Sequence, residues 1–176
     1  MSVMPIAVHR THPAAIAALL VAIGGAATIL GAYYFQYVLH YAPCELCLDE
    51  RIPYYVAIPL ALVVALAASL RAPRPLLVAG LALLAIIMLI NVGLGVYHSG
   101  VEWKFWPGPA HCSGAINNFG NAGGLMDQMN QTRIVPCDAA AWRLFGISLA
   151  GYNALISLAL AAIALWGIAA ARKQKG

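Results

Sequence analysis

Long apolar runs alternate with short polar segments along the chain. Uncharged residues, mostly Ala, Leu, Ile, Val and Gly, fill positions 14–39, and similar runs cover 52–70, 75–98 and 144–171. An α-helix needs roughly 20 such residues to cross a bilayer. The pattern therefore predicts four membrane-spanning helices, with one long polar loop at 99–143. The first run is too long for the apolar region of a cleaved signal peptide, so we expect it to remain as a span.

The composition indicates the same class of protein. Of the 176 residues, 62% are hydrophobic and only 9% are charged, whereas soluble domains carry about a quarter charged residues. The length suits a single domain, 1–176. The net charge of +4 does not form a basic stripe on a polar face, which argues against nucleic acid as a partner. The predicted fold class is an all-α membrane protein, a four-transmembrane-helix bundle with a long outer loop.

Two prolines lie within the second apolar run. Pro53 suits the first turn of a helix if Asp49 is the N-cap. Pro59 is expected to kink that helix unless neighbouring groups satisfy the carbonyl that it leaves unpaired.

The distribution of charge predicts the orientation in the membrane. Four spans place both termini and the 71–74 turn on one side, which holds six basic residues and no acidic residue. The other side holds four basic and all six acidic residues. By the positive-inside rule the termini are cytoplasmic, and the long loop faces outward, into the periplasm of a bacterial cell. The six inner basic residues are Arg10, Arg71, Arg74, Arg172, Lys173 and Lys175.

Aromatic residues gather near the outer ends of the predicted spans. Tyr and Trp are enriched at membrane–water interfaces, so we interpret this group as an interfacial belt. It comprises Tyr33, Tyr34, Tyr37, Tyr41, Tyr54, Tyr55, Tyr97, Trp103, Trp106 and Trp142.

A C-x-x-C pair, Cys44 and Cys47, lies between the first two spans. Such a pair serves either reversible dithiol chemistry or metal ligation. Leu48 takes the place of the His that a c-type haem attachment motif requires. Arg51 follows four residues after Cys47, and a fixed positive charge near a thiol favours the reactive thiolate.

The other two cysteines, Cys112 and Cys137, lie in the long loop. All four are therefore on the outer, oxidising side, where disulfides persist. Of the three pairings that four cysteines allow, we expect Cys44 with Cys47 and Cys112 with Cys137.

Three interpretations of the cysteines compete. Structural disulfides would explain the loop pair well, since closing that loop contributes about 3 kcal/mol, but a C-x-x-C ring is too short to restrict the unfolded chain much. A metal site formed by all four cysteines, with His98 or His111 as substitutes, lacks the close spacing of structural zinc sites in its second pair. A dithiol relay, in which the loop pair exchanges with an outside protein and passes electrons to the membrane-edge pair, accounts for both pairs and is the interpretation we favour.

A relay needs an electron acceptor, and at the bilayer edge a lipid-soluble quinone is the evident one. Arg51 would stabilise negative charge on a quinone oxygen or on the Cys47 thiolate. His98, at the end of the third span, would donate a hydrogen bond. Alternatively, Arg51 is a snorkelling interfacial residue and His98 only marks a helix end.

The chain resembles the DsbB family of quinone-dependent disulfide-bond formation proteins. The similarity rests on the four-span layout, on the stretch 44–51 (Cys-Glu-Leu-Cys-Leu-Asp-Glu-Arg), and on Pro136-Cys137-Asp138 with Trp142 and Gly146 beyond it. It covers nearly the whole chain.

The resemblance implies a role for each cysteine. Cys112 would form the mixed disulfide with a DsbA-like thioredoxin-fold partner, and Cys137 would carry electrons inward to Cys44. Cys47 would make the thiolate–quinone contact, with Arg51 beside it and His98 near the quinone, which would be ubiquinone or menaquinone.

The resemblance also implies a short membrane-lying helix at 124–133, with Leu125, Met126 and Met129 as its apolar contacts with the lipid. Glu45 would tune the reduction potential or match a dedicated partner. Two alternatives stay open: a paralogue that serves one dedicated partner, and a non-enzymatic four-helix scaffold held by two disulfides.

Overall fold

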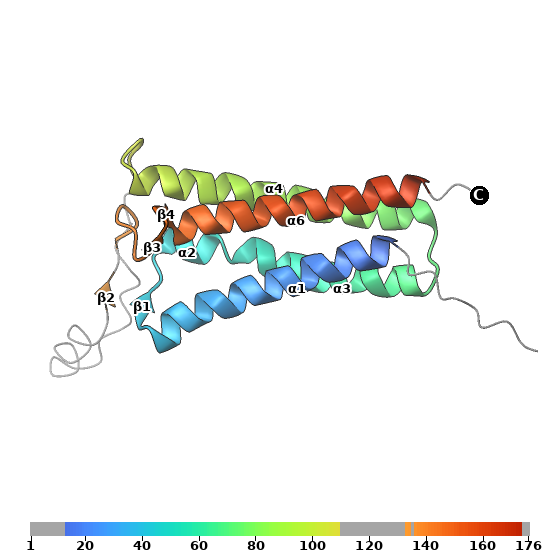
Figure 1. The fold of residues 1–176 in the computed structure, drawn as a ribbon, viewed down its shortest axis with the longest axis horizontal. Coiled ribbons are helices and arrows are strands. Elements are labelled where there is room, and N and C mark those ends of the chain that lie inside the picture. The colour runs from blue at the N-terminus through green and yellow to red at the C-terminus, as the bar shows by residue number, and fades with distance from the viewer. Residues whose placement is uncertain (1–12, 110–132, 135, 174–176) are drawn as a thin grey trace, which may run out of the picture.

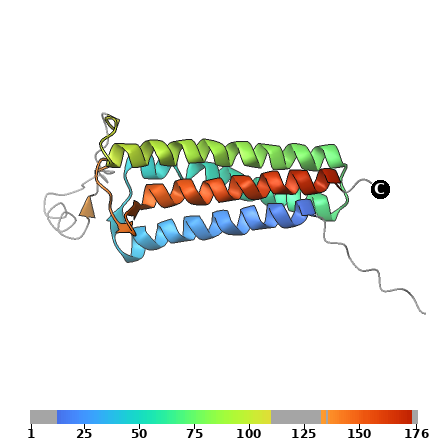
Figure 2. The same cartoon turned by 45° about the horizontal axis from the view of Figure 1, so that its top comes forward.

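The computed structural model describes residues 13–109, 133–134 and 136–173. Within them, four long helices lie side by side as an antiparallel bundle (Figures 1 and 2). Each is long and apolar enough to cross a membrane, so the chain is a multi-pass membrane protein, and the predicted fold class is confirmed. The helices are α1 (Pro13–Tyr33, continued by the π-helical turn η1, Tyr34–Val38), α3 (Ile52–Ser69), α4 (Arg74–Glu102) and α6 (Leu149–Lys173).

Small residues bring the helices close together. The core of the bundle holds Ala14, Ala17, Ala161 and Ala164, each at most 1% exposed. At Gly167 of α6, an added Cβ would lie 2.5 Å from the Cβ of Ala17 on α1, so only glycine fits there. Such close approach is how helices pack in lipid, where the hydrophobic effect does not drive them together.

The outward faces of the helices are apolar. Large side chains such as Ile23, Leu30, Val63 and Leu70 are all more than 60% exposed. In water this would be a liability, whereas hydrocarbon chains solvate such a surface without cost. The bundle is therefore built to face lipid on its sides and to keep its few polar groups inside.

The ends of two helices differ from the predicted spans. The third helix, α4, continues past His98 to Glu102, because both side chains face the protein interior rather than the aqueous loop. The fourth begins at Leu149, not at residue 144. Residues 143–148 instead form a hairpin of β3 (Arg143–Leu144) and β4 (Ile147–Ser148).

The hairpin is closed by Phe145 and Gly146, both in the left-handed region (φ 50° and 82°), as tight two-residue turns require. Ser148 then caps α6, its Oγ accepting from the backbone N–H of Gly151 at 3.2 Å. A helix could not have continued backward through this turn.

The second span also starts differently. A short helix, α2 (Glu45–Asp49), comes first, with Cys44 as its N-cap. The N-cap of α3 is Arg51, not Asp49, although Pro53 does lie in its first turn as predicted. The α3 helix runs on through Pro59 without ending.

Two short strands tie the loops together at the same end of the bundle. Strand β1 (Tyr41–Ala42) pairs in parallel with β2 (Arg133–Ile134), which returns the long loop to the C-x-x-C. Arg133 is thus in a strand, not at the end of a helix. The remainder of the helix predicted for 124–133 lies outside the described residues. At the opposite end of the bundle α1 begins, α3 turns into α4, and α6 ends (Figure 1).

Candidate functional site

The C-x-x-C forms the N-terminal turn of α2. The sulfurs of Cys44 and Cys47 lie 2.9 Å apart and share a hydrogen bond, and the backbone N–H of Cys47 donates to the Cys44 Sγ at 3.3 Å. Both residues are free thiols, so the structure presents the dithiol form of this pair rather than the disulfide in which we paired them. The two sulfurs need only a small movement to reach the roughly 2.05 Å of a disulfide bond.

Cys44 is the more buried of the two thiols, with 2% of its surface exposed. Its hydrogen bond with the Cys47 thiol lowers the pKa of Cys44 below the ordinary value, against the opposing effect of burial. Its backbone hydrogen bonds act in the same direction, while the charge of Glu50 opposes them. The local geometry therefore favours a thiolate on Cys44.

His98 reaches this pair from α4. Its Nε2 lies 3.7 Å from the Cys44 sulfur, and its Nδ1 lies 2.8 Å from Oε1 of Glu50. A second carboxylate, Glu102, is 3.9 Å from Nε2, one turn further along the same helix. The structure places its ring in a cysteine–histidine–glutamate arrangement with Cys44. The expected place of His98 near a quinone stays a prediction.

Arg51 is buried, with 8% exposed, and it reaches across to the first helix. Its Nη1 donates to Oε1 of Gln36 at 2.7 Å, and its guanidinium carbon lies 5.5 Å from the ring centre of Tyr33. A freely snorkelling arginine would keep its head group in water. The packed side chain argues against that alternative, although its contacts are with Gln36 and Tyr33 rather than with Cys47.

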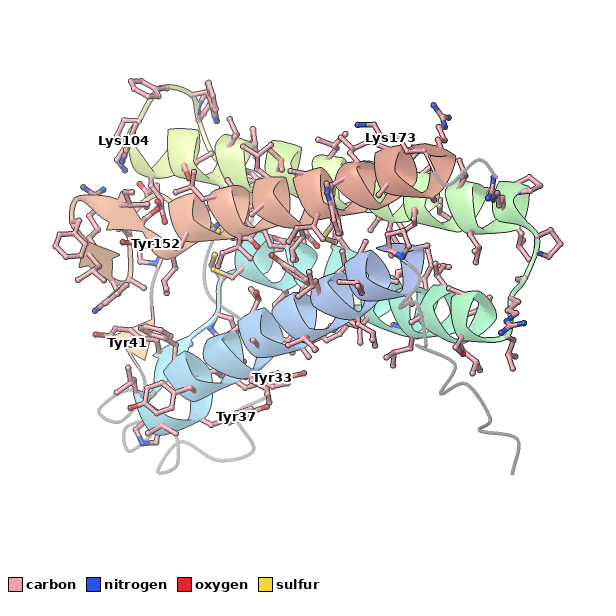
Figure 3. All side chains as sticks on the ribbon, turned by 45° about the vertical axis from the view of Figure 1, so that its right-hand side comes forward. Tyr33, Tyr37, Tyr41, Lys104, Tyr152 and Lys173 are labelled. Atoms are coloured by element: carbon pink, nitrogen blue, oxygen red, sulfur yellow. The ribbon has the colours of Figure 1, made fainter. Side chains whose placement is uncertain are left out.

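A cavity of about 410 Å³ opens beside these groups, within the usual size range of small-molecule sites. It lies between the C-terminal half of α1 and helices α3 and α6, with Cys44, Cys47, Glu50, Arg51, His98 and Glu102 in its wall. Most of the remaining wall is apolar, including Ala27, Ile29, Ala32, Phe35, Leu149, Ala150 and Ile156. Figure 3 shows Tyr33 and Tyr41 on the α1 side, with Tyr152 on α6.

A buried polar network continues the wall of the cavity toward the middle of the bundle. The Tyr54 hydroxyl donates to Oδ1 of Asn153 at 2.8 Å and lies 2.9 Å from the Ser157 hydroxyl, which also accepts from Asn91 at 2.9 Å. Tyr54 is only 2% exposed, so it does not belong to the interfacial belt in which we placed it. Polar groups at this depth are expensive in a membrane and commonly functional.

Cys137 meets the C-x-x-C from the long loop. It is fully buried and packs in a small core with Cys44, Leu46 and Val101, against which Cys47 also lies. It is disulfide-bonded, whereas Cys112, the partner we expected, lies outside the described residues. Next to it, Asp138 pairs with Lys104 at the end of α4, and this hydrogen bond lowers the pKa of the Asp138 carboxyl.

Sequence reasoning missed three residues of this site. Glu50 and Glu102 had been counted only as outer acidic charges, yet both are 8% exposed and flank His98. The i, i+4 spacing of His98 and Glu102 was the available signal. Gln36, in the first span, holds Arg51, and an amide within an otherwise apolar run could have marked it.

The fold and the site together define a membrane-embedded dithiol protein. The model of the family "Disulfide bond formation protein DsbB" matches residues 14–167. The chain belongs to the DsbB family, whose members form disulfide bonds at the membrane.

One relative bears a name that assigns no activity. It is "Uncharacterized protein RP370" of Rickettsia prowazekii (strain Madrid E), 34% identical over 131 residues, which cover 73% of each chain. No solved structure matches the chain.

Proposed function

We propose that the protein is a quinone-dependent thiol oxidase that re-oxidises a DsbA-like thioredoxin-fold protein. The observation that carries the proposal is the position of the Cys44–Cys47 dithiol. It forms part of the wall of an apolar cavity and also belongs to the small core that holds buried Cys137. That is the position a relay between a loop disulfide and a lipid-soluble acceptor requires. The alternative, in which both pairs are purely structural disulfides, does not explain two free thiols beside a cavity.

The electrons move two at a time. The partner's dithiol reduces the Cys112–Cys137 disulfide and becomes a disulfide itself. The Cys137 thiolate then attacks Cys44 of an oxidised Cys44–Cys47 pair, which releases the Cys47 thiolate. Attack of Cys112 on Cys137 restores the loop disulfide and leaves Cys44 and Cys47 as the dithiol seen here. The packing of Cys137 and Cys44 in one small core supports exchange between the two pairs.

The cavity fits a quinone by its size, its apolar wall and its single guanidinium. A quinone supplies an acceptor for two electrons and two protons when it is bound. Arg51 would hold a carbonyl oxygen by its charge and its planar donors. His98, with Glu50 fixing its Nδ1, accepts the proton of the Cys44 thiol as the Cys44–Cys47 bond re-forms.

The energetics require such an acceptor. A DsbA-type partner is a strong oxidant, at about −120 mV, while structural disulfides lie below about −300 mV. For a two-electron couple every 30 mV corresponds to about 1.4 kcal/mol, so ordinary disulfides alone would not drive the reaction forward. We propose that the quinone pool provides the remaining driving force, and that the site faces the periplasm of a bacterial inner membrane.

The test is a turnover assay with purified protein, a reduced thioredoxin-fold protein and a soluble ubiquinone or menaquinone analogue. Cys112→Ser and Cys137→Ser should each abolish oxidation of the partner, yet leave the Cys44–Cys47 pair able to reduce quinone. Folded Cys44→Ala protein that oxidises the partner at the wild-type rate would refute the relay. Lost abundance in all three cysteine variants, without a specific electron-transfer defect, would favour structural disulfides instead.

A further inference from the structure

We propose that the reduced site is also a binding site for a thiophilic d¹⁰ cation such as Zn²⁺, held by Cys44, Cys47 and His98. One ligand atom from each of the three residues lies within 4.8 Å of the other two. They come from two elements, the N-terminal turn of α2 and the helix α4, so the fold itself brings them together. The inference requires only the dithiol, not a quinone or a protein partner.

The distances suit tetrahedral coordination. Bonds of about 2.3 Å to sulfur and about 2.0 Å to nitrogen place neighbouring ligand atoms roughly 3.5–3.8 Å apart. The Cys44 sulfur and His98 Nε2 are already 3.7 Å apart. The two sulfurs, at 2.9 Å, must separate by somewhat less than 1 Å, which a small rotation of the partly buried Cys47 side chain provides.

The surroundings of His98 are those of a metal ligand. Histidines that bind zinc usually donate their other ring N–H to a carboxylate, which fixes the tautomer and makes the ligand nitrogen more basic. Glu50 occupies that place, 2.8 Å from Nδ1, and leaves Nε2 directed at the sulfurs. The arrangement is the carboxylate–histidine pair of a zinc site, without requiring any rearrangement of α4.

Glu102 lies beside the three proposed ligands. Its Oε1 lies 3.9 Å from His98 Nε2, and its Oε2 is buried with no hydrogen-bond partner among the described residues. A buried, unpaired carboxylate oxygen is costly, and a cation beside it removes that cost. Two thiolates also neutralise a divalent cation, so binding adds no net charge to the interior.

Binding is coupled to the redox state. Metal ligation needs both cysteines as thiolates, and it releases the protons that the thiols still carry. The Cys44–Cys47 disulfide has no thiolate to offer, so the oxidised protein should not bind. Conversely, a bound cation occupies the electron pairs that disulfide formation would use. Zn²⁺ should therefore hold the protein in its reduced state and inhibit re-oxidation until the metal leaves.

The experiment is a titration of full-length protein that carries Cys112→Ser and Cys137→Ser, so that only the C-x-x-C thiols remain. Cd²⁺ serves as the probe, because thiolate ligation gives it an ultraviolet charge-transfer band. We expect one equivalent to bind to the reduced protein and none to the oxidised protein. Glu50→Gln should weaken binding about 10–100-fold, and His98→Ala by at least as much. His40→Ala, an exposed histidine outside the cluster, is the matched control.

The proposal is overturned if the oxidised protein takes up the same amount of Cd²⁺, or if folded His98→Ala binds as tightly as the control. Should His98→Ala fail to fold, X-ray absorption at the zinc edge of the unsubstituted site decides the matter. Two sulfur ligands with at least one imidazole support the site, and sulfur with water alone contradicts it. Oxidase activity measured with a chelator present is a separate readout, so its loss would leave the metal result standing.

Discussion

At the residue scale, the dithiol lies between groups of opposite charge. Two buried carboxylates, Glu50 and Glu102, flank His98 on the Cys44 side, while the guanidinium of Arg51 lies toward the first helix. We propose that the Cys44 side handles protons and that the region of Arg51 binds an anion. The two thiols are only three positions apart in the sequence, yet the fold gives them different neighbours.

The first prediction concerns the pKa of the Cys44 thiol. Because the hydrogen bond with Cys47 lowers the pKa of Cys44, removal of the Cys47 thiol should raise the pKa of Cys44. In the Cys112→Ser, Cys137→Ser background, we expect reduced protein to show one thiolate absorbance step with a midpoint below the ordinary cysteine value of about 8.5. Adding Cys47→Ala should move that midpoint to higher pH. A midpoint that stays where it was would show that another group sets it.

Arg51 is the subject of a second prediction. Losing an electrostatic stabiliser of this kind typically reduces the rate by about 10²–10³. Arg51→Ala should therefore slow turnover and raise the KM for quinone, and Arg51→Lys should recover only part of the activity, because a point charge lacks the planar donor fork. Gln36→Ala, which only frees the guanidinium, should give a milder defect of the same kind.

The control for these variants is Arg71→Ala, an exposed arginine in the turn at the far end of the bundle. Quinone-titrated oxidation of a saturating reduced partner measures all four. Wild-type turnover and KM in folded Arg51→Ala would leave this arginine with a purely structural role between α1 and α3.

At the element scale, α1 and α6 approach each other closely at the end of the bundle opposite the dithiol. Gly167 allows α6 to approach Ala17 there, while Phe35 and Gln36, at the dithiol end of the same chain segment, belong to the cavity wall. A third prediction follows. Gly167→Ala places a methyl group 2.5 Å from a carbon that cannot turn away, and overpacking of this kind typically costs about 1–3 kcal/mol of stability.

Gly93→Ala is the matched control, since an added Cβ there meets nothing within 4 Å. It should be neutral, or stabilising by up to about 1 kcal/mol, because alanine is the better helix former. Unfolding in detergent, followed by the loss of helical signal, measures both variants. Equal stability of the two would mean that α1 and α6 are free to move apart without penalty.

How much the sequence could predict also differs from element to element. The four spans were evident because a helix that faces lipid needs a long, uncharged run of residues. The start of α6 was not evident, because residues 144–148 are mostly apolar and hydropathy alone does not distinguish an apolar hairpin from the first turns of an apolar helix. The end of α4 was missed because Glu102 is charged, and a charged residue suggests that the span has already ended. Its burial beside His98 is a tertiary contact that hydropathy does not reveal.

In the candidate site, too, the sequence revealed local patterns but not tertiary contacts. The C-x-x-C, the loop cysteines and Arg51 were recognisable from spacing and family resemblance. The partners that give each residue its chemistry were not, since Cys44 meets His98 across 54 positions and Arg51 meets Gln36 across 15. Residue types identified the reaction class, whereas the fold identified which thiol has a base beside it.

At the scale of the whole molecule, the bundle has two unlike ends. One end carries the dithiol, Cys137, the paired strands and the hairpin. The other carries the α3–α4 turn and the cluster of Arg172 and Lys173 that ends α6, and Figure 3 shows Lys104 and Lys173 at opposite ends of the bundle. We propose that the basic end is cytoplasmic, as the positive-inside rule indicates.

The orientation is the fourth prediction. The native thiols are poor reporters, because Cys44 and Cys137 are buried and would react slowly from either side. Lys104 and Arg71 are better positions, since both are exposed and they lie at opposite ends of the bundle. They are also matched in backbone conformation, because both are left-handed (φ 62° and 59°). In a cysteine-free background, Lys104→Cys should react with a membrane-impermeant thiol reagent on intact bacterial cells. Arg71→Cys should react only after lysis. The reverse pattern would put the dithiol in the reducing cytoplasm, where a disulfide relay would have no oxidised product to sustain.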